Sequence, residues 1–283
     1  MPRLKSTGKC NFCGHVYEKS GLSRHLKTCK ARQDAIAKKR GKPAQNFHIQ
    51  VEGYYHPVYW MHLEMSGEST LYDLDQFLRD VWLECCGHLS EFTINHKNYS
   101  IDAGMDYDSV VEDMEMPTFD PPQFLPGAQD ALKKQFGEEG SEEIMSLFQS
   151  LFANPLGWMD DFDDNLSMNI KLKEVLTPKL KFRHIYDFGT STELALKVVD
   201  VREGKPLTTK REPVFVMSRN DPPPLVCEVC GEPATQVCTQ CIWEGTGWVC
   251  DKHTAQHEED YLLPVVNSPR VGMCGYTGDV EFF

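Results

Sequence analysis

The sequence predicts an α+β protein in which a mainly antiparallel sheet with helices is flanked by two small zinc-stabilised modules. Three observations lead to this fold class. Between residues 47 and 216, short segments alternate apolar and polar residues with few helical patterns between them, as half-buried strands do. At both ends of the chain, cysteines and histidines recur at the spacing of zinc ligands. A chain of 283 residues, 41% of them hydrophobic, is long enough for one sizeable core.

Residues 1–42 are expected to form a C2HC zinc finger with a basic extension. Two cysteines separated by two residues make a knuckle, and a histidine and a cysteine four residues apart fall on one face of a helix. Ser20 is placed to cap that helix. The predicted ligands are Cys10, Cys13, His25 and Cys29.

The same segment is strongly basic, because it holds twelve Lys and Arg residues against Glu18 and Asp34. Such a head either meets an anionic partner or folds back onto the acidic remainder of the chain, and the sequence does not choose between them. Contacts to phosphates would give salt-sensitive, non-specific binding of DNA or RNA, and a solvated linker is the plainer alternative. The candidate nucleic-acid contacts are Arg24, Lys27, Lys30, Arg32, Lys38, Lys39 and Arg40.

The central domain is expected over residues 47–216. Thr70 and Asp73 form a capping box ahead of a predicted helix over residues 71–82. The last two strands are expected to pair through a turn in which Asp187 is a turn residue and Gly189 takes a positive φ. The predicted strands are residues 48–52, 58–65, 92–99, 180–186 and 194–199.

Four stretches of this domain carry a resemblance to a known family. They are the strand over 58–65, the helix over 71–82, the run His88-Leu89-Ser90-Glu91-Phe92 and, above all, Tyr186-Asp187-Phe188-Gly189. They resemble the plasmid Ri open-reading-frame-three-like (Orf3-like) family, also described as insertion-element passenger, resolvase-like proteins. The resemblance covers residues 47–216 and implies a compact α+β fold without implying a particular chemistry.

The residues of this domain argue against catalysis. A recombinase surrounds its nucleophile with several arginines, whereas residues 47–200 contain only Arg79 and Arg183. His62, His88 and His184 would have to converge to form a metal or acid–base cluster. We therefore expect that the chain is not an enzyme, with an enzyme of unknown reaction in the central domain as one alternative.

An acidic helical insertion is expected to interrupt the domain at about residues 106–176. Residues 106–164 hold fifteen Asp and Glu residues against two lysines. Two short amphipathic helices are predicted there, over residues 128–136 and 141–152, and their apolar stripes suit either a core or a docking partner.

Residues 225–283 are expected to form a two-zinc cross-brace module behind a stiff proline spacer at residues 222–224. The sequence supplies the ligands but not their pairing, and the alternatives to Cys274 as the eighth ligand are Asp260 or no eighth ligand at all. With eight positions filled, both ions would be structural rather than catalytic. One ion is assigned to Cys227, Cys230, Cys250 and His253, and the other to Cys238, Cys241, His257 and Cys274.

Together these features predict a non-catalytic protein with three Zn²⁺ ions that acts as an interaction or adaptor protein for an unidentified protein partner. The ligand order of the C-terminal module is similar to that of B-box fingers, which bind proteins. A nucleic-acid-associated accessory factor of a mobile element, using the basic finger, is the alternative. Residues 1–5 lead into no apolar run, so we expect a cytoplasmic location, reduced cysteines and no membrane partner.

Overall fold

The computed structural model describes residues 6–101 and 165–278, and every structural statement below refers to them. Up to Ile101 and from Ser167 onwards, they belong to one compact unit. The acidic insertion expected at about residues 106–176 lies, up to residue 164, outside the described residues, and so do both of its predicted helices.

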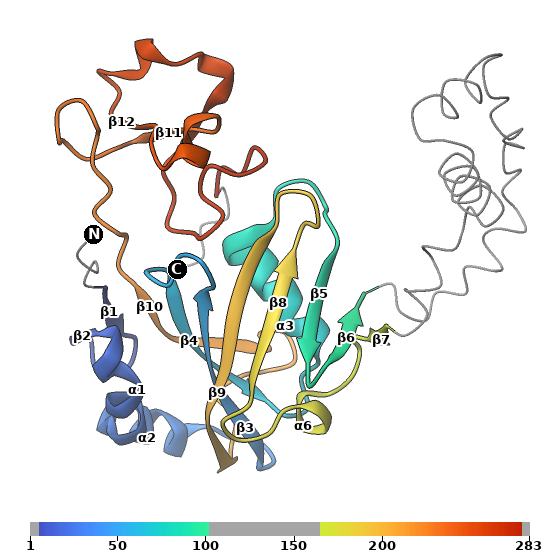
Figure 1. Ribbon diagram of the computed structural model, residues 1–283. Helices are drawn as coiled ribbons and strands as arrows, with labels where there is room; N and C mark the ends of the chain where they lie inside the picture. Colours follow the sequence, from blue (N-terminus) through green and yellow to red (C-terminus); the bar gives the residue numbers. More distant parts are fainter. Residues whose placement is uncertain (1–5, 102–164, 279–283) are drawn as a thin grey trace, which may run out of the picture. The chain divides into compact units, whose positions relative to one another are not determined.

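A ten-stranded, mostly antiparallel sheet forms the frame of this unit (Figure 1). Its strands lie in the order β2-β1-β10-β4-β3-β9-β8-β5-β6-β7. Strands were predicted at residues 48–52, 58–65, 180–186 and 194–199, and the structure has β3, β4, β8 and β9 there, although β4 begins two residues later and β8 one residue later than predicted. The strands are β1 (Thr7–Cys10), β2 (Val16–Glu18), β3 (Ala44–Gly53), β4 (Trp60–Ser66), β5 (Ser90–Ile94), β6 (Lys97–Ser100), β7 (Leu166–Ser167), β8 (Lys181–Tyr186), β9 (Thr192–Gly204) and β10 (Val214–Asn220).

The single strand predicted over residues 92–99 is a hairpin of two strands, β5 and β6. Asn95 and His96 both have positive φ, 51° and 65°, which turns the chain back between them. The predicted helix over residues 71–82 begins as expected, since Thr70 Oγ1 accepts a hydrogen bond from the Asp73 amide at 3.1 Å. It is α-helical as α3 (Leu71–Leu78) and continues as a π-helical turn, η1 (Arg79–Leu83).

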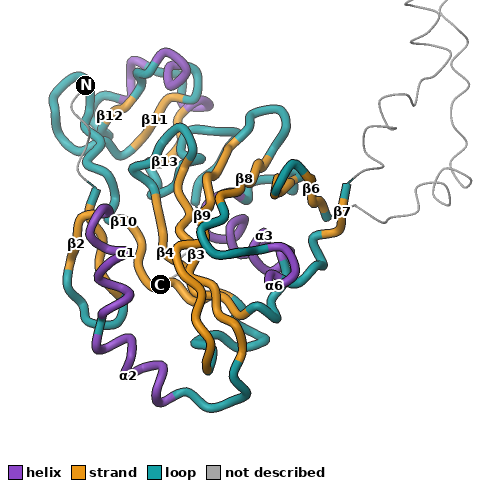
Figure 2. Tube along the Cα trace, turned by 60° about the horizontal axis from the view of Figure 1, so that its bottom comes forward, coloured by secondary structure: helices purple, strands orange, loops and turns teal. Residues whose placement is uncertain are grey.

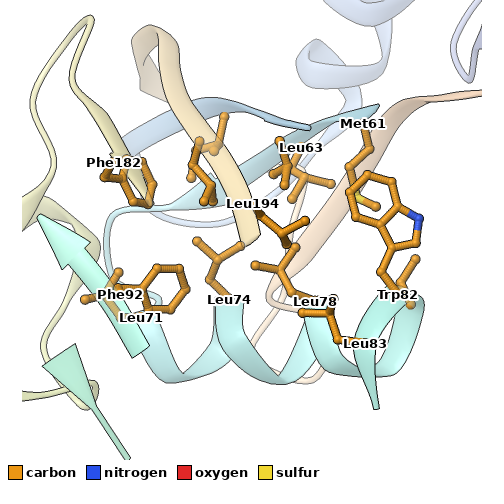
Figure 3. Packing of buried hydrophobic residues seen from close by; sticks show 14 of the residues in the cluster. Met61, Leu63, Leu71, Leu74, Leu78, Trp82, Leu83, Phe92, Phe182 and Leu194 are labelled. Atoms are coloured by element: carbon orange, nitrogen blue, oxygen red, sulfur yellow. The ribbon is translucent and has the colours of Figure 1, made fainter. Parts of the chain in front are cut away.

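The core lies between α3 and the sheet. Figure 3 shows Leu71, Leu74 and Leu78 of α3 directed at side chains of the strands, among them Leu63 and Leu194. These side chains are all fully buried, so the spacing of apolar residues that predicted the helix is also the spacing of its buried face.

The finger is joined to the body by its backbone. Strand β1 pairs antiparallel with β10, which in turn pairs with β4. Two helices follow β2, α1 (Lys19–Thr28) and α2 (Lys30–Lys38), and a short helix α6 (Leu172–Val175) follows β7 (Figure 2). None of the helices among the described residues has both the length and the apolar character to cross a membrane.

The C-terminal segment contains a small sheet in the order β12-β11-β13. A spacer that holds this segment away from the body was expected, and that expectation is wrong. Trp82 Nε1 donates to the Asn267 carbonyl at 3.1 Å, and Val237 and Val271 belong to the same hydrophobic cluster as α3. The elements are β11 (Gln236–Cys238), η3 (Cys241–Glu244), β12 (Trp248–Val249), η4 (Thr254–Gln256), η5 (Glu259–Tyr261) and β13 (Leu262–Pro264).

Candidate metal centres

Cysteines and histidines gather in four groups in which the ligand atoms of all members lie within 4.8 Å of one another. All eleven cysteines of the chain belong to one of these groups. The groups are Cys10, Cys13, His25 and Cys29; Cys227, Cys230, Cys250 and His253; Cys238, Cys241 and His257; and Cys85, Cys86, His88 and Cys274. Thiolate and imidazole are the ligands that zinc prefers in proteins, so each group has the donor set of a zinc-type site.

The first group brings together the four residues predicted as ligands of the finger. Cys13 Sγ lies 3.4 Å from His25 Nε2, and the ring of Tyr17 stacks on the imidazole with 3.9 Å between centroids. A backbone hydrogen bond from His15 is the main cause that lowers the pKa of Cys13 to about 6, while burial raises that of Cys10 to about 11. Cys13 is therefore ready to bind a cation as a thiolate at neutral pH.

The second group has the membership that the cross-brace pairing predicted. Cys230 Sγ is 3.7 Å from Cys250 Sγ, and Cys227 Sγ is 3.5 Å from His253 Nδ1. Gly231 directly follows Cys230, and its φ of +75° turns the chain at the end of the Cys227–Cys230 knuckle. Burial raises the pKa of Cys227, but backbone hydrogen bonds from Cys250 and Cys230 outweigh it and lower that pKa to about 6.

The third group differs from its prediction. Cys241 Sγ lies 3.6 Å from His257 Nδ1, and Cys238 completes a group of three. Neither Cys274 nor its competitor Asp260 belongs to it within the part of the chain that the structure describes. The argument that all eight positions of the C-terminal module are filled is therefore not supported by this arrangement.

Cys274 lies in the fourth group and not in the predicted one, because the segment around it packs on the body. Ser268 Oγ donates to the Trp82 carbonyl at 2.7 Å, and Tyr276 is buried with its hydroxyl 3.5 Å from the Val81 carbonyl. These contacts carry Cys274 to the loop that follows η1. Its Sγ lies 3.2 Å from His88 Nε2 and 3.8 Å from Cys86 Sγ.

The fourth group was not predicted from the sequence, although a local signal was present. Cys85 and His88 are separated by two residues, the same spacing as Cys250 and His253. The fourth member, Cys274, is separated from them by most of the chain, so no local pattern could connect it with the loop.

The three histidines considered for catalysis do not converge. His62 Nδ1 is 2.8 Å from His48 Nε2, His184 Nε2 is 2.7 Å from Asp75 Oδ1, and His88 belongs to the fourth group. Burial lowers the pKa of His62 to about 3 and that of His48 well below its usual value. These two histidines are therefore neutral residues of the interior at neutral pH.

A buried ion pair joins the turn after β8 to the C-terminal segment. Arg270 donates to Asp187 Oδ2 at 2.8 Å and to Thr192 Oγ1 at 3.0 Å. Although burial raises the pKa of Asp187, hydrogen bonds from Thr190 and Arg270 hold it below its usual range. The positive φ of this turn belongs to Asp187, at 66°, and not to Gly189 as predicted, because the Asp187 carboxylate folds back to accept from the Gly189 amide.

The basic head folds back onto the body. Arg32 is buried and donates to Glu64 Oε2 at 2.8 Å, Lys39 donates to the Leu207 carbonyl at 2.7 Å, and Lys27 lies 3.3 Å from Asp200. The other candidate contacts are exposed on or beside α1 and α2: Arg24, Lys30, Lys38 and Arg40. Three of the seven basic residues predicted to contact nucleic acid, Lys27, Arg32 and Lys39, thus contact other parts of the same chain.

Comparisons with known proteins agree with the central domain. The family model described as "plasmid pRiA4b ORF-3-like protein" matches residues 44–242. A crystal structure of a protein of unknown function, MM3350 from Methanosarcina mazei Go1, is 14% identical, covers 62% of this chain and 68% of that chain, and has a TM-score of 0.35. A similarity at that level carries no weight for function. No curated protein matches the chain.

Proposed function

This chain belongs to the plasmid pRiA4b ORF-3-like protein family, and from that premise we propose that it is a non-catalytic, zinc-binding interaction or adaptor protein. Zinc is the metal that fits the donor sets best, since every group combines thiols with an imidazole. Three ions were predicted from the sequence, one in the finger and two in the C-terminal module. Their role is to fix short segments whose own cores are too small to fold alone.

The observation that carries the interaction proposal is the side chain of Trp243, which is 65% exposed. It lies on the turn η3, which starts at the group member Cys241, and its neighbour Ile242 packs against the main core. The indole is therefore presented from a turn that is anchored by the two residues directly before Trp243. Tryptophan dominates the binding energy of many interfaces, and a fixed anchor loses little conformational entropy when a partner binds.

Other exposed apolar side chains of the C-terminal module support a docking role. Val226 and Val229, beside the first knuckle of the module, are about half exposed. Trp248, the second tryptophan of the module, is only partly exposed and packs against the main core. Trp243 is thus available to anchor a partner, while Trp248 holds the module on the body.

The environment of the histidines supports the non-catalytic part of the proposal. A general base needs a pKa near the working pH and access to substrate, whereas His48 and His62 are buried with strongly lowered pKa values. His184 is likewise without exposed surface and is held by Asp75.

The test is affinity capture with the full chain as bait. Trp243→Ala should lose a protein partner that the unchanged chain retains. Tyr55→Ala is the matched control, because Tyr55 is 67% exposed but lies in the body. The Tyr55→Ala variant should capture that partner as well as the unchanged chain does. Equal capture by the Trp243→Ala variant, or no partner for the unchanged chain, would contradict the proposal.

A nuclease arm in the same experiment separates the alternative function. Arg24, Lys30, Lys38 and Arg40 are exposed cations of the head, and they favour nucleic acid as a second candidate ligand. Partners that disappear after nuclease treatment would be bridged by DNA or RNA. Replacement of Arg24, Lys30 and Arg40 by Gln should then remove them, while Arg211→Gln, at another exposed site, should not.

A further inference from the structure

The fourth group has the geometry of a tetrahedral metal site. Cys86 Sγ is 3.6 Å from Cys85 Sγ and 3.8 Å from Cys274 Sγ. In a tetrahedral site with zinc–sulfur bonds of about 2.3 Å, two thiolates are about 3.8 Å apart. Cys86 is therefore separated from each of the other two thiols by the distance that a shared ion requires.

The second group provides an internal standard for this geometry, because its ligands were predicted from spacing alone. There, the Cys230 and Cys250 sulfurs are 3.7 Å apart, and Cys250 Sγ is 3.2 Å from His253 Nδ1. In the fourth group the thiols are 3.6 and 3.8 Å apart, and His88 Nε2 lies 2.9 Å from Cys86 Sγ and 3.2 Å from Cys274 Sγ. The fourth group is thus as closely assembled as a group with a clear sequence signature.

The surroundings suit bound thiolates. Three thiolates and a neutral imidazole around a divalent cation leave one negative charge. Arg270, which has no exposed surface, donates to Cys85 Sγ at 3.3 Å as well as to Asp187. Such charge-assisted hydrogen bonds from outside the ligand shell orient and stabilise metal-bound thiolates.

The backbone on both sides of the group is held in unusual conformations. Cys274 has φ of 44°, a left-handed value that non-glycine residues seldom adopt, and Gly275 and Gly87 also have positive φ. On the other side, Cys85 follows the π-helical turn η1, a kind of turn that is frequent at functional sites. Both segments are anchored by buried residues, Arg270 and Tyr276 in one and Arg79 in the other.

We propose that Cys85, Cys86, His88 and Cys274 bind a further metal ion of the zinc class, which fastens the C-terminal segment to the loop after η1. The ion links residues that are distant in sequence and keeps the Arg270–Asp187 pair in place. The proposal does not rest on the interaction surface proposed around Trp243. A Cys86–Cys274 disulfide and a metal-free cluster of hydrogen-bonded thiols are the competing states.

The first test counts metal ions on the full chain by native mass spectrometry. Cys86→Ser and Cys274→Ser should each carry one ion fewer than the unchanged chain, and the double variant should also lose only one. Met273→Ser, next to a ligand, should keep the full number. Full occupancy in Cys86→Ser and Cys274→Ser would overturn the proposal.

The second test uses the unchanged chain and so does not depend on the folding of a variant. Cys86 and Cys274 are exposed, so free thiols there are accessible to N-ethylmaleimide and should become alkylated. With a bound ion, both should resist alkylation until a chelator is added, as mapped on peptides by mass spectrometry. Reaction without chelator would reveal free thiols, and resistance with chelator would reveal a disulfide; either result would refute the metal site.

Discussion

Arg270 shows how much of the architecture can depend on one residue. It is fully buried, and its guanidinium donates to the Thr190 carbonyl, Thr192, Asp187 and Cys85 while lying 4.8 Å from the ring centroid of Tyr186. All of these partners belong to the body, whereas Arg270 belongs to the C-terminal segment. One side chain therefore ties the candidate metal loop, the turn after β8 and the end of the chain together.

Arg270→Leu should destabilise the chain by about 3 kcal/mol or more, because it leaves the carboxylate of Asp187 buried without its cation. Urea unfolding followed by tryptophan fluorescence measures this loss. Arg211→Leu, a replacement at an exposed arginine, should change the free energy of unfolding by about 0.5 kcal/mol or less. Similar effects of the two replacements would show that the buried pair contributes little.

The His48–His62 pair gives the stability a dependence on pH. The pKa of both side chains is lower in the folded chain than in the unfolded one, so the folded state is favoured fully above the ordinary histidine pKa of about 6.5. This contribution falls as the pH drops towards the folded pKa of His62, about 3. Each histidine should add a slope of about 1.4 kcal/mol per pH unit below about 6.

His62→Gln should flatten the acid side of the stability curve relative to the unchanged chain by about that slope. Metal ligands that protonate in the same range affect both chains, so the difference between the two curves reports on His62 together with its effect on His48. Urea unfolding at several values between pH 4 and pH 7 measures it. Parallel curves would mean that His62 has the same pKa in both states.

At the level of elements, most local patterns were interpreted correctly, with the exception of the turn at Asn95 and His96, whereas pairings between distant strands were not predicted. The helix α3 was predicted because its capping box and its apolar spacing lie within a dozen residues. Strand β10 was not predicted, although it is the element that joins β1 of the finger to β4 of the body. The run Val214-Phe215-Val216-Met217 is a local strand signal that was overlooked, whereas the pairing of this strand with β1 and β4 depends on two distant parts of the chain.

The joint between β1 and β10 depends on Gly8. A Cβ atom at this position would lie 2.3 Å from the Arg219 carbonyl oxygen and 2.6 Å from the Trp60 ring, so a side chain requires the strands to separate. Gly8→Ala should therefore speed amide hydrogen exchange at residues 7–10 and 218–220.

Gly21→Ala in α1 is the matched control, because nothing lies within 4 Å of its Cβ position. It should leave the exchange rates of β1 and β10 unchanged and slightly favour the helix. Equal protection in the two variants would show that the finger is held by its other contacts, such as the Arg32–Glu64 pair.

For the molecule as a whole, the sequence predicted which residues gather in the finger and in the first C-terminal group, but it treated the modules as more independent than they are. These two groups were predicted because CxxC and CxxH spacings are local. The position of Cys274 was not predicted, because it depends on the packing of Ser268, Arg270 and Tyr276 against residues that are distant in the sequence. The sequence allowed the basic head either to meet an anionic partner or to fold back onto the body. The buried side chain of Arg32 favours folding back.

The account rests on metal ions that hold the segments of this chain together. Anomalous X-ray scattering from crystals of the full chain, measured above and below the zinc absorption edge, tests it most directly because it locates each ion. We expect one zinc peak within each of the four groups, including the one between the Cys85–His88 loop and Cys274. Ordered cysteines and histidines without zinc peaks in these groups would contradict the account.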